Sequence, residues 1–141
     1  MSDKTEADRR VEVREEHSRE VSGYIDLWVD TCGSVAKEKG FHDSVEMDGG
    51  VVRPTSPVER MMLIVSEVSE MMEAYRARPE TNFTFFEVDG KPEGIPSELA
   101  DIVIRCFDFA FVYNIPLGEI MVAKTIFNHT RRSHRHGGKA I

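Results

Sequence analysis

The 141-residue chain lacks the sequence features that mark disulfide-rich, zinc-binding, membrane-spanning and secreted proteins. Its two cysteines, Cys32 and Cys106, are far apart and lack metal-ligand spacing, which argues against a disulfide framework and a zinc site. No apolar run approaches the ~18 residues that cross a bilayer, and the first residues lack the apolar core of a signal peptide. We therefore expect a cytoplasmic protein with free thiols and no membrane partner.

Several enzyme motifs are missing as well. The sequence contains no GxxxxGK[ST] phosphate loop and no evident Ser-His-Asp or Cys-His set for nucleophilic catalysis. A ferritin-like di-iron bundle needs a glutamate three residues before a histidine on each of two helices, and none of the five histidines has one. A hydrolytic reaction in this protein would therefore use direct attack by water.

Negative charge dominates most of the chain. The net charge is −7, but residues 21–119 carry 8 basic and 18 acidic side chains, whereas residues 120–141 carry 5 basic and no acidic ones. The acidic body argues against a protein that coats nucleic acid, so we expect no nucleic-acid partner. The basic end has two interpretations: a solvated tail that balances the acidic body, or a segment that binds an anion such as a phosphate chain.

The sequence does contain the periodicity of an all-α protein. Apolar residues recur at three- and four-residue steps from Val21 onward, and Gly40 is suited to end that helix in a left-handed conformation. Ser56 opens a second helix as its N-cap, with Pro57 at the first helical position and Glu59 completing a capping box. The pattern predicts a four-helix bundle, with one helix ending at Gly40, one over 56–76, one over 97–113 and one from Pro116 to about Arg132.

The N-terminal segment differs in composition from the rest. Residues 1–16 are dense in charge and poor in apolar side chains, which predicts either a mobile segment or a frayed helical extension. We expect the remaining residues, 17–141, to form one domain with a basic C-terminal tail.

Two connections between the expected helices are rich in glycine and proline. Residues 41–55 are expected to be loop. Residues 79–96 form a long connection, in which residues 83–90 could make a short hairpin around the Asp89-Gly90 turn.

Paired carboxylates mark two of the expected helices. Glu67 and Glu70 are three residues apart on the second helix, as are Glu98 and Asp101 on the third, so each pair shares a helical face. At about 100° per residue, Glu67 lies within or at the edge of the apolar face of its helix. The charged residues of the third helix occupy a strip roughly 80° wide, which holds Glu98, Asp101, Arg105 and Asp108. If the helices pack together, the four carboxylates converge; the alternative is that each pair is simply the solvated or interfacial face of its helix.

Four carboxylates in a sheltered place predict a metal site. Like charges and lost solvation raise the pKa of each carboxyl group, and a hard divalent cation with oxygen ligands removes this conflict. Mg²⁺, for which Mn²⁺ can substitute, keeps water ligands and shares its coordination sphere with substrate phosphates. The expected substrate is therefore a polyphosphate.

A basic face is expected on the fourth helix. Lys124, Asn128 and Arg131 follow one another at steps of four and three residues and therefore share a face. An ammonium, an amide and a guanidinium together suit phosphate oxygens. The alternative is that basic residues near the end of a helix interact favourably with its dipole.

In order along the chain, these blocks resemble the MazG-like, all-α nucleotide pyrophosphohydrolases. Glu67-Val-Ser-Glu70 and, 27 residues later, Glu98-Leu-Ala-Asp101 are similar to the ExxE…ExxD signature of that family, and Lys124 to Arg131 and His136-Gly-Gly-Lys139 follow. The similarity covers about residues 20–139. It implies a MazG-like bundle assembled as a homodimer or a dimer of dimers, which suits the extra apolar circumference of the third helix.

The resemblance also implies a reaction: Mg²⁺-dependent hydrolysis of a (deoxy)nucleoside triphosphate to the monophosphate and pyrophosphate, in nucleotide-pool control or removal of non-standard nucleotides. The metal ligands and catalytic carboxylates would be Glu67, Glu70, Glu98 and Asp101. The residues that hold the phosphates would be Lys124, Asn128 and Arg131. Residues 80–92 form a longer connection than the compact members of the family have. The alternative function is a non-catalytic helical module that binds a nucleotide or a protein.

Overall fold

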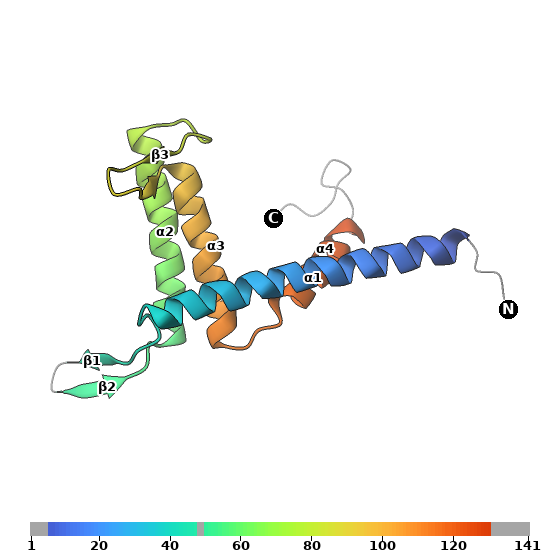
Figure 1. Ribbon diagram of the computed structural model, residues 1–141, viewed down its shortest axis with the longest axis horizontal. Coiled ribbons are helices and arrows are strands. Elements are labelled where there is room, and N and C mark those ends of the chain that lie inside the picture. The colour runs from blue at the N-terminus through green and yellow to red at the C-terminus, as the bar shows by residue number, and fades with distance from the viewer. Residues whose placement is uncertain (1–5, 48–49, 131–141) are drawn as a thin grey trace. The chain divides into compact units, whose positions relative to one another are not determined.

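The computed structural model describes residues 6–47 and 50–130. These residues form four helices and two short two-stranded sheets (Figure 1), so the described part of the chain is mostly helical, as predicted. The helices are α1 (Glu6–Glu38), α2 (Pro57–Ala77), α3 (Ile95–Val112) and α4 (Leu117–Thr130). The described residues divide into two compact units, one within residues 29–115 and one of residues 6–28 and 116–130. No single helix in the described ranges is long and apolar enough to cross a membrane.

Both ends of the connection between α1 and α2 confirm the sequence prediction. Gly40 has a φ of 80°, and the N–H of Phe41 donates to the carbonyl of Ala36 at 3.0 Å, which is the pattern of a Schellman C-cap. At the start of α2, Ser56 Oγ accepts a hydrogen bond from the Glu59 N–H at 3.2 Å, and the Glu59 carboxylate accepts one from the Ser56 N–H at 2.7 Å. This reciprocal pair is the predicted capping box.

α1 begins at Glu6. Residues 6–16 are therefore helical, which agrees with the second of the two alternatives for the N-terminal segment, a helical extension. Residues 1–5 lie outside the described residues.

The two glycine-rich connections each contain a hairpin. β3 (Phe85–Phe86) pairs antiparallel with β4 (Pro92–Glu93), and the Gly90 N–H donates to the Glu87 carbonyl at 2.9 Å, which confirms the predicted turn. The expectation of a loop over 41–55 is wrong in part, because β1 (Val45–Met47) pairs antiparallel with β2 (Val51–Arg53). The β-branched and apolar residues on both sides of the glycine pair favour strands, and this signal was masked by the short length of each run.

The unit of residues 29–115 is built on α2 and α3, which lie side by side and run in opposite directions (Figure 1). The last part of α1 approaches α3 closely: a Cβ on Gly33 would lie 2.0 Å from the ring of Phe111. Only glycine leaves room for this contact. The buried side chains of this unit include polar as well as apolar ones, namely Val29, Cys32, Ala110, Arg60, Glu67, Glu98 and Asp108.

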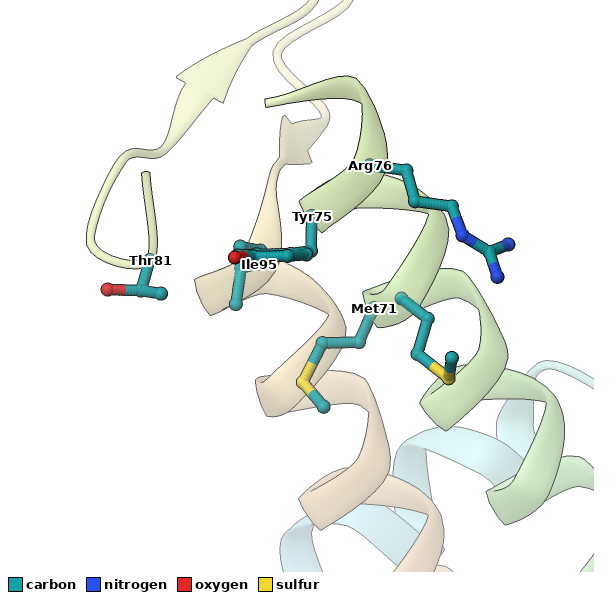
Figure 2. A pocket seen from close by; sticks show the side chains of 6 residues that line it. Met71, Tyr75, Arg76, Thr81 and Ile95 are labelled. Atoms are coloured by element: carbon teal, nitrogen blue, oxygen red, sulfur yellow. The ribbon is translucent and has the colours of Figure 1, made fainter. Parts of the chain in front are cut away.

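Many large apolar side chains of the same unit remain exposed. Five of them fall within about 80° of the α2 circumference. We call this set the apolar stripe of α2; it consists of Met61, Val65, Val68, Met72 and Tyr75. Part of the stripe borders an apolar hollow of about 430 Å³ (Figure 2), whose lining residues are Met71, Met72, Tyr75, Arg76, Thr81 and Ile95.

The other unit is held by a close contact between the first part of α1 and α4. The N–H of Gly118 donates to Asp26 Oδ1 at 3.2 Å, so a carboxylate satisfies a backbone donor at the start of α4. A Cβ on Gly118 would lie 2.5 Å from the carbonyl oxygen of Ser22, so this approach also requires glycine.

Candidate functional site

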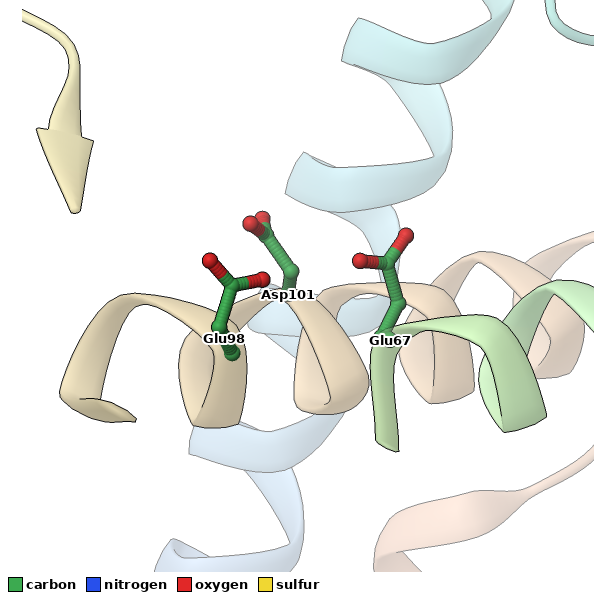
Figure 3. A group of neighbouring side chains, drawn as sticks. All are labelled: Glu67, Glu98 and Asp101. Carbon is green, nitrogen blue, oxygen red and sulfur yellow. The ribbon is translucent and has the colours of Figure 1, made fainter. Parts of the chain in front are cut away.

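Three of the four predicted metal ligands lie together between α2 and α3. Glu67 from α2 and Glu98 and Asp101 from α3 each place one carboxylate oxygen within 4.8 Å of the other two. Figure 3 shows the three side chains extending toward the same side of the helix pair. We call these three residues the acidic cluster. Glu67 is 7% exposed and Glu98 is 9% exposed, which agrees with the predicted sheltered position of Glu67.

Glu70, the fourth predicted ligand, lies outside this group and is exposed. Its charge nevertheless acts on the cluster, because it helps to raise the pKa of Glu98. Glu70 follows Glu67 by three residues and therefore lies on the same face of α2.

The acidic cluster carries unfavourable charge. Burial first, and then the charges of Glu70 and Asp101, raise the pKa of Glu98 above its ordinary value. Burial and the charge of Glu67 raise the pKa of Asp101, while Arg105 and Lys91 partly oppose this shift. A bound divalent cation would relieve these repulsions, and carboxylate oxygens are the donors that Mg²⁺ prefers. The residues present therefore fit a magnesium ion.

Arg105 joins the cluster from the charged strip of α3. Its Nε donates a hydrogen bond to Glu67 Oε1 at 3.0 Å, which links α3 to α2. The guanidinium carbon also lies 5.5 Å from the ring centre of Phe41. The sequence placed Arg105 on the same strip as Glu98 and Asp101 but gave no sign that its partner would be Glu67 on another helix.

The β3–β4 hairpin contributes two further charges. Lys91 forms an ion pair with Glu93, and the pKa of Lys91 is raised by Glu93 first and also by Glu98 and Asp101. Sequence reasoning missed both residues as neighbours of the cluster. The available signal was that Glu93 precedes α3 by two residues, close to the end of the helix that carries Glu98.

A second polar group lies farther along the same helix pair. Asp108 Oδ2 accepts a hydrogen bond from Arg60 Nη1 at 3.0 Å, and Asp108 Oδ1 lies 2.6 Å from His42 Nε2. Arg60 Nη2 also donates to the carbonyl oxygen of Phe41 at 3.4 Å. We call His42, Arg60 and Asp108 the Asp108 cluster. It ties the segment after α1 to both α2 and α3.

The apolar hollow is not part of the acidic site. The α2 residues that line it spread over roughly 40° to 180° from Glu67 on the helical wheel; they are Met71, Tyr75, Met72 and Arg76. The hollow therefore begins beside Glu67 and extends around α2 away from it, and no member of the acidic cluster lines it.

The predicted phosphate-binding residues belong to the other unit. Lys124 and Asn128 are both exposed on α4, and Lys124 Nζ lies 5.8 Å from the ring centre of Phe127. Arg131 and the basic tail that follows it lie outside the described residues.

The geometry of the acidic cluster and the order of the sequence blocks are thus the grounds for assigning a function. Comparison with known proteins adds no relative, since no family model, no curated protein and no solved structure significantly matches this chain.

Proposed function

We propose that this chain is a Mg²⁺-dependent nucleoside triphosphate pyrophosphohydrolase of the MazG-like type, which converts a (deoxy)nucleoside triphosphate to the monophosphate and pyrophosphate. The observation that carries the proposal is the acidic cluster, in which three carboxylate oxygens from two helices lie within 4.8 Å of one another. Two of its residues are buried, where like charges without a cation are costly. The ExxE…ExxD blocks support the same assignment.

In this proposal Glu67, Glu98 and Asp101 hold Mg²⁺, with Mn²⁺ as a possible substitute. The bound ion would supply the positive charge that the phosphate oxygens require as the phosphoanhydride bond breaks. Glu70 is exposed beside the cluster, so it can act as a fourth ligand or accept a proton from the attacking water.

The phosphate chain would be held by the basic face of α4. Lys124 and Asn128 are exposed and therefore open to a ligand, and Arg131 follows them at helical spacing in the sequence. Their role would be to bind phosphate oxygens more tightly in the transition state than in the ground state.

The exposed apolar surface supports self-association as a homodimer or a dimer of dimers. The apolar stripe of α2 and, on α3, Leu99 and Val103 leave large apolar side chains exposed, and exposed apolar patches are typical of interaction surfaces. The same surface favours the second candidate function, a non-catalytic helical module that binds a protein or a nucleotide.

Pyrophosphate release separates the two candidates. The purified full chain is incubated with a panel of normal and damaged ribo- and deoxyribonucleoside triphosphates, with Mg²⁺ or with EDTA. We expect equal amounts of monophosphate and pyrophosphate from at least one substrate, with Mg²⁺ only. If no triphosphate in the panel yields pyrophosphate with Mg²⁺ or Mn²⁺, the hydrolase is excluded and the binding module remains.

A further inference from the structure

The acidic cluster already has a cation of its own. Arg105 Nε lies 3.0 Å from Glu67 Oε1, and the side chains are 29% and 9% exposed, respectively. Among the described residues, no other basic side chain forms a hydrogen bond or ion pair with a member of the cluster. The negative charge of buried Glu67 is therefore balanced by a residue from the neighbouring helix.

A metal ion in the cluster and the Arg105 guanidinium act on the same carboxylates. Arg105 uses an oxygen of Glu67, and its charge is also felt by Asp101, which is one helical turn away on α3. Two cations that share a carboxylate in a partly buried place repel each other and compete for it. The binding of one therefore weakens the binding of the other.

Resting on the proposed function, we infer that Arg105 is a positioning residue that replaces the metal ion in the metal-free protein. It holds Glu67 in place across the contact of α2 and α3, and it lowers the affinity of the acidic cluster for a divalent cation. The same guanidinium lies within cation–π range of the Phe41 ring, 5.5 Å from its centre.

Arg105→Met tests this inference, because methionine keeps much of the apolar stem and removes the charge. We expect a lower melting temperature in EDTA, since Glu67 then lacks its partner, and a Kd for Mn²⁺ that is roughly fivefold lower, measured by calorimetry without nucleotide. Arg105→Lys keeps the charge, so its Mn²⁺ affinity should stay close to that of the wild type.

Arg60→Met is the matched control, because Arg60 forms a buried ion pair in the same unit with Asp108, outside the acidic cluster. It should lower the melting temperature and leave the Mn²⁺ affinity unchanged. If Arg105→Met does not fold alone, we expect the added substitution Glu67→Gln to restore folding, because it removes the buried charge that needs Arg105.

The outcomes are distinct. An Mn²⁺ affinity that is unchanged or weaker in Arg105→Met overturns the inference and leaves the proposed function standing, provided that the wild type binds Mn²⁺. If the decreases in melting temperature caused by Glu67→Gln and Arg105→Met simply add in the double variant, the two side chains do not interact, and the inference is overturned as well. Absence of Mn²⁺ binding by the wild type overturns both the inference and the proposed metal site.

Discussion

Two polar clusters lie along the contact of α2 and α3, and they differ in their balance of charge. In the Asp108 cluster a single carboxylate has Arg60 on one oxygen and His42 on the other, and both Asp108 and Arg60 are buried. In the acidic cluster three carboxylates have one arginine contact among them. Burial of charge alone therefore does not distinguish a candidate functional site from a structural ion pair. An excess of buried charge of one sign does.

The difference comes from the residue that α2 presents near each aspartate of α3. Asp101 and Asp108 are seven residues apart on α3, and Glu67 and Arg60 are seven residues apart on α2, so the members of each pair lie two turns apart on the same face. Where α2 presents an arginine, the aspartate of α3 is neutralised. Where α2 presents Glu67, three carboxylates lie together. Among the described residues, the only ion pair with these carboxylates is the one that Arg105 of α3 forms.

The largest expected effect is the loss of catalysis when the acidic cluster is altered. Asp101→Asn should reduce kcat by at least about a thousandfold and keep the fold, because it removes the charge of a proposed metal ligand and leaves the shape of the side chain unchanged. Pyrophosphate release and circular dichroism check this. Glu73→Gln is the control, since Glu73 is an exposed acid on α2 that pairs with Arg76, and it should retain normal activity. Near-normal turnover in Asp101→Asn would contradict the assigned site.

Disrupting the Asp108 cluster should lower the stability of the fold and leave metal binding unchanged. Asp108→Asn leaves the buried Arg60 without a counter-charge, so we expect a loss of about 3–5 kcal/mol in the free energy of unfolding, measured with urea. The affinity for Mn²⁺ should not change at a temperature where the variant remains folded. A weakened Mn²⁺ affinity would show that the two clusters act as one site.

A residue of the other unit tests whether the acidic cluster acts alone. Lys124→Ala should raise KM and lower kcat together, with kcat/KM reduced about 10- to 100-fold, because phosphate contacts tighten in the transition state. Steady-state kinetics with the preferred triphosphate measure this effect. Lys37→Ala serves as a control for the loss of one exposed lysine, and unchanged kinetics in Lys124→Ala would remove that residue from the site.

The smallest expected effect concerns the stability of the metal-free protein. The raised pKa of Glu98 means that the folded state binds its proton more tightly than the unfolded state does, so stability in EDTA falls as pH rises through the raised pKa. Glu98→Gln should therefore be more stable than the wild type at pH 7, by about 1 kcal/mol or roughly 2–5 °C in Tm. The advantage should shrink as the pH falls through the raised pKa, where Glu98 of the folded wild type becomes protonated, and should be lost near the ordinary glutamate pKa of about 4.3.

Thermal melts in EDTA at several pH values measure this difference. Adding Mg²⁺ at pH 7 should reverse the order of stability, because only the wild type keeps all of the proposed metal ligands. A wild type that is more stable than Glu98→Gln in EDTA at pH 7 would show that the Glu98 charge is favourable without a metal ion.

Local chemistry made much of the fold predictable. The capping box at Ser56, the left-handed Gly40 and the Asp89-Gly90 turn each depend on residues close in sequence, so the boundaries of α2, the end of α1 and the second hairpin followed from the sequence. The β1–β2 hairpin was missed because three-residue strands give too short a period to recognise.

The candidate site was predictable only in part. The helical wheel of α2 predicted Glu67 beside apolar residues, and that of α3 predicted Glu98 and Asp101 on one narrow strip. Both predictions were possible because each depends on the sequence of a single helix. Glu70 was predicted as a metal ligand equal to the other three but is exposed. The rotation of α2 about its axis against α3 decides whether Glu67 or Glu70 is enclosed.

The sequence by itself determined the helices, their caps and the acidic pairs, because such features depend on contacts a few residues apart. Tertiary structure alone decided which charges meet. It paired Arg60 with Asp108 across 48 residues and Arg105 with Glu67 across 38, and it left Glu98 and Asp101 in excess. The register of two antiparallel helices determines these pairings, and it depends on packing over the whole contact, which no single helix encodes.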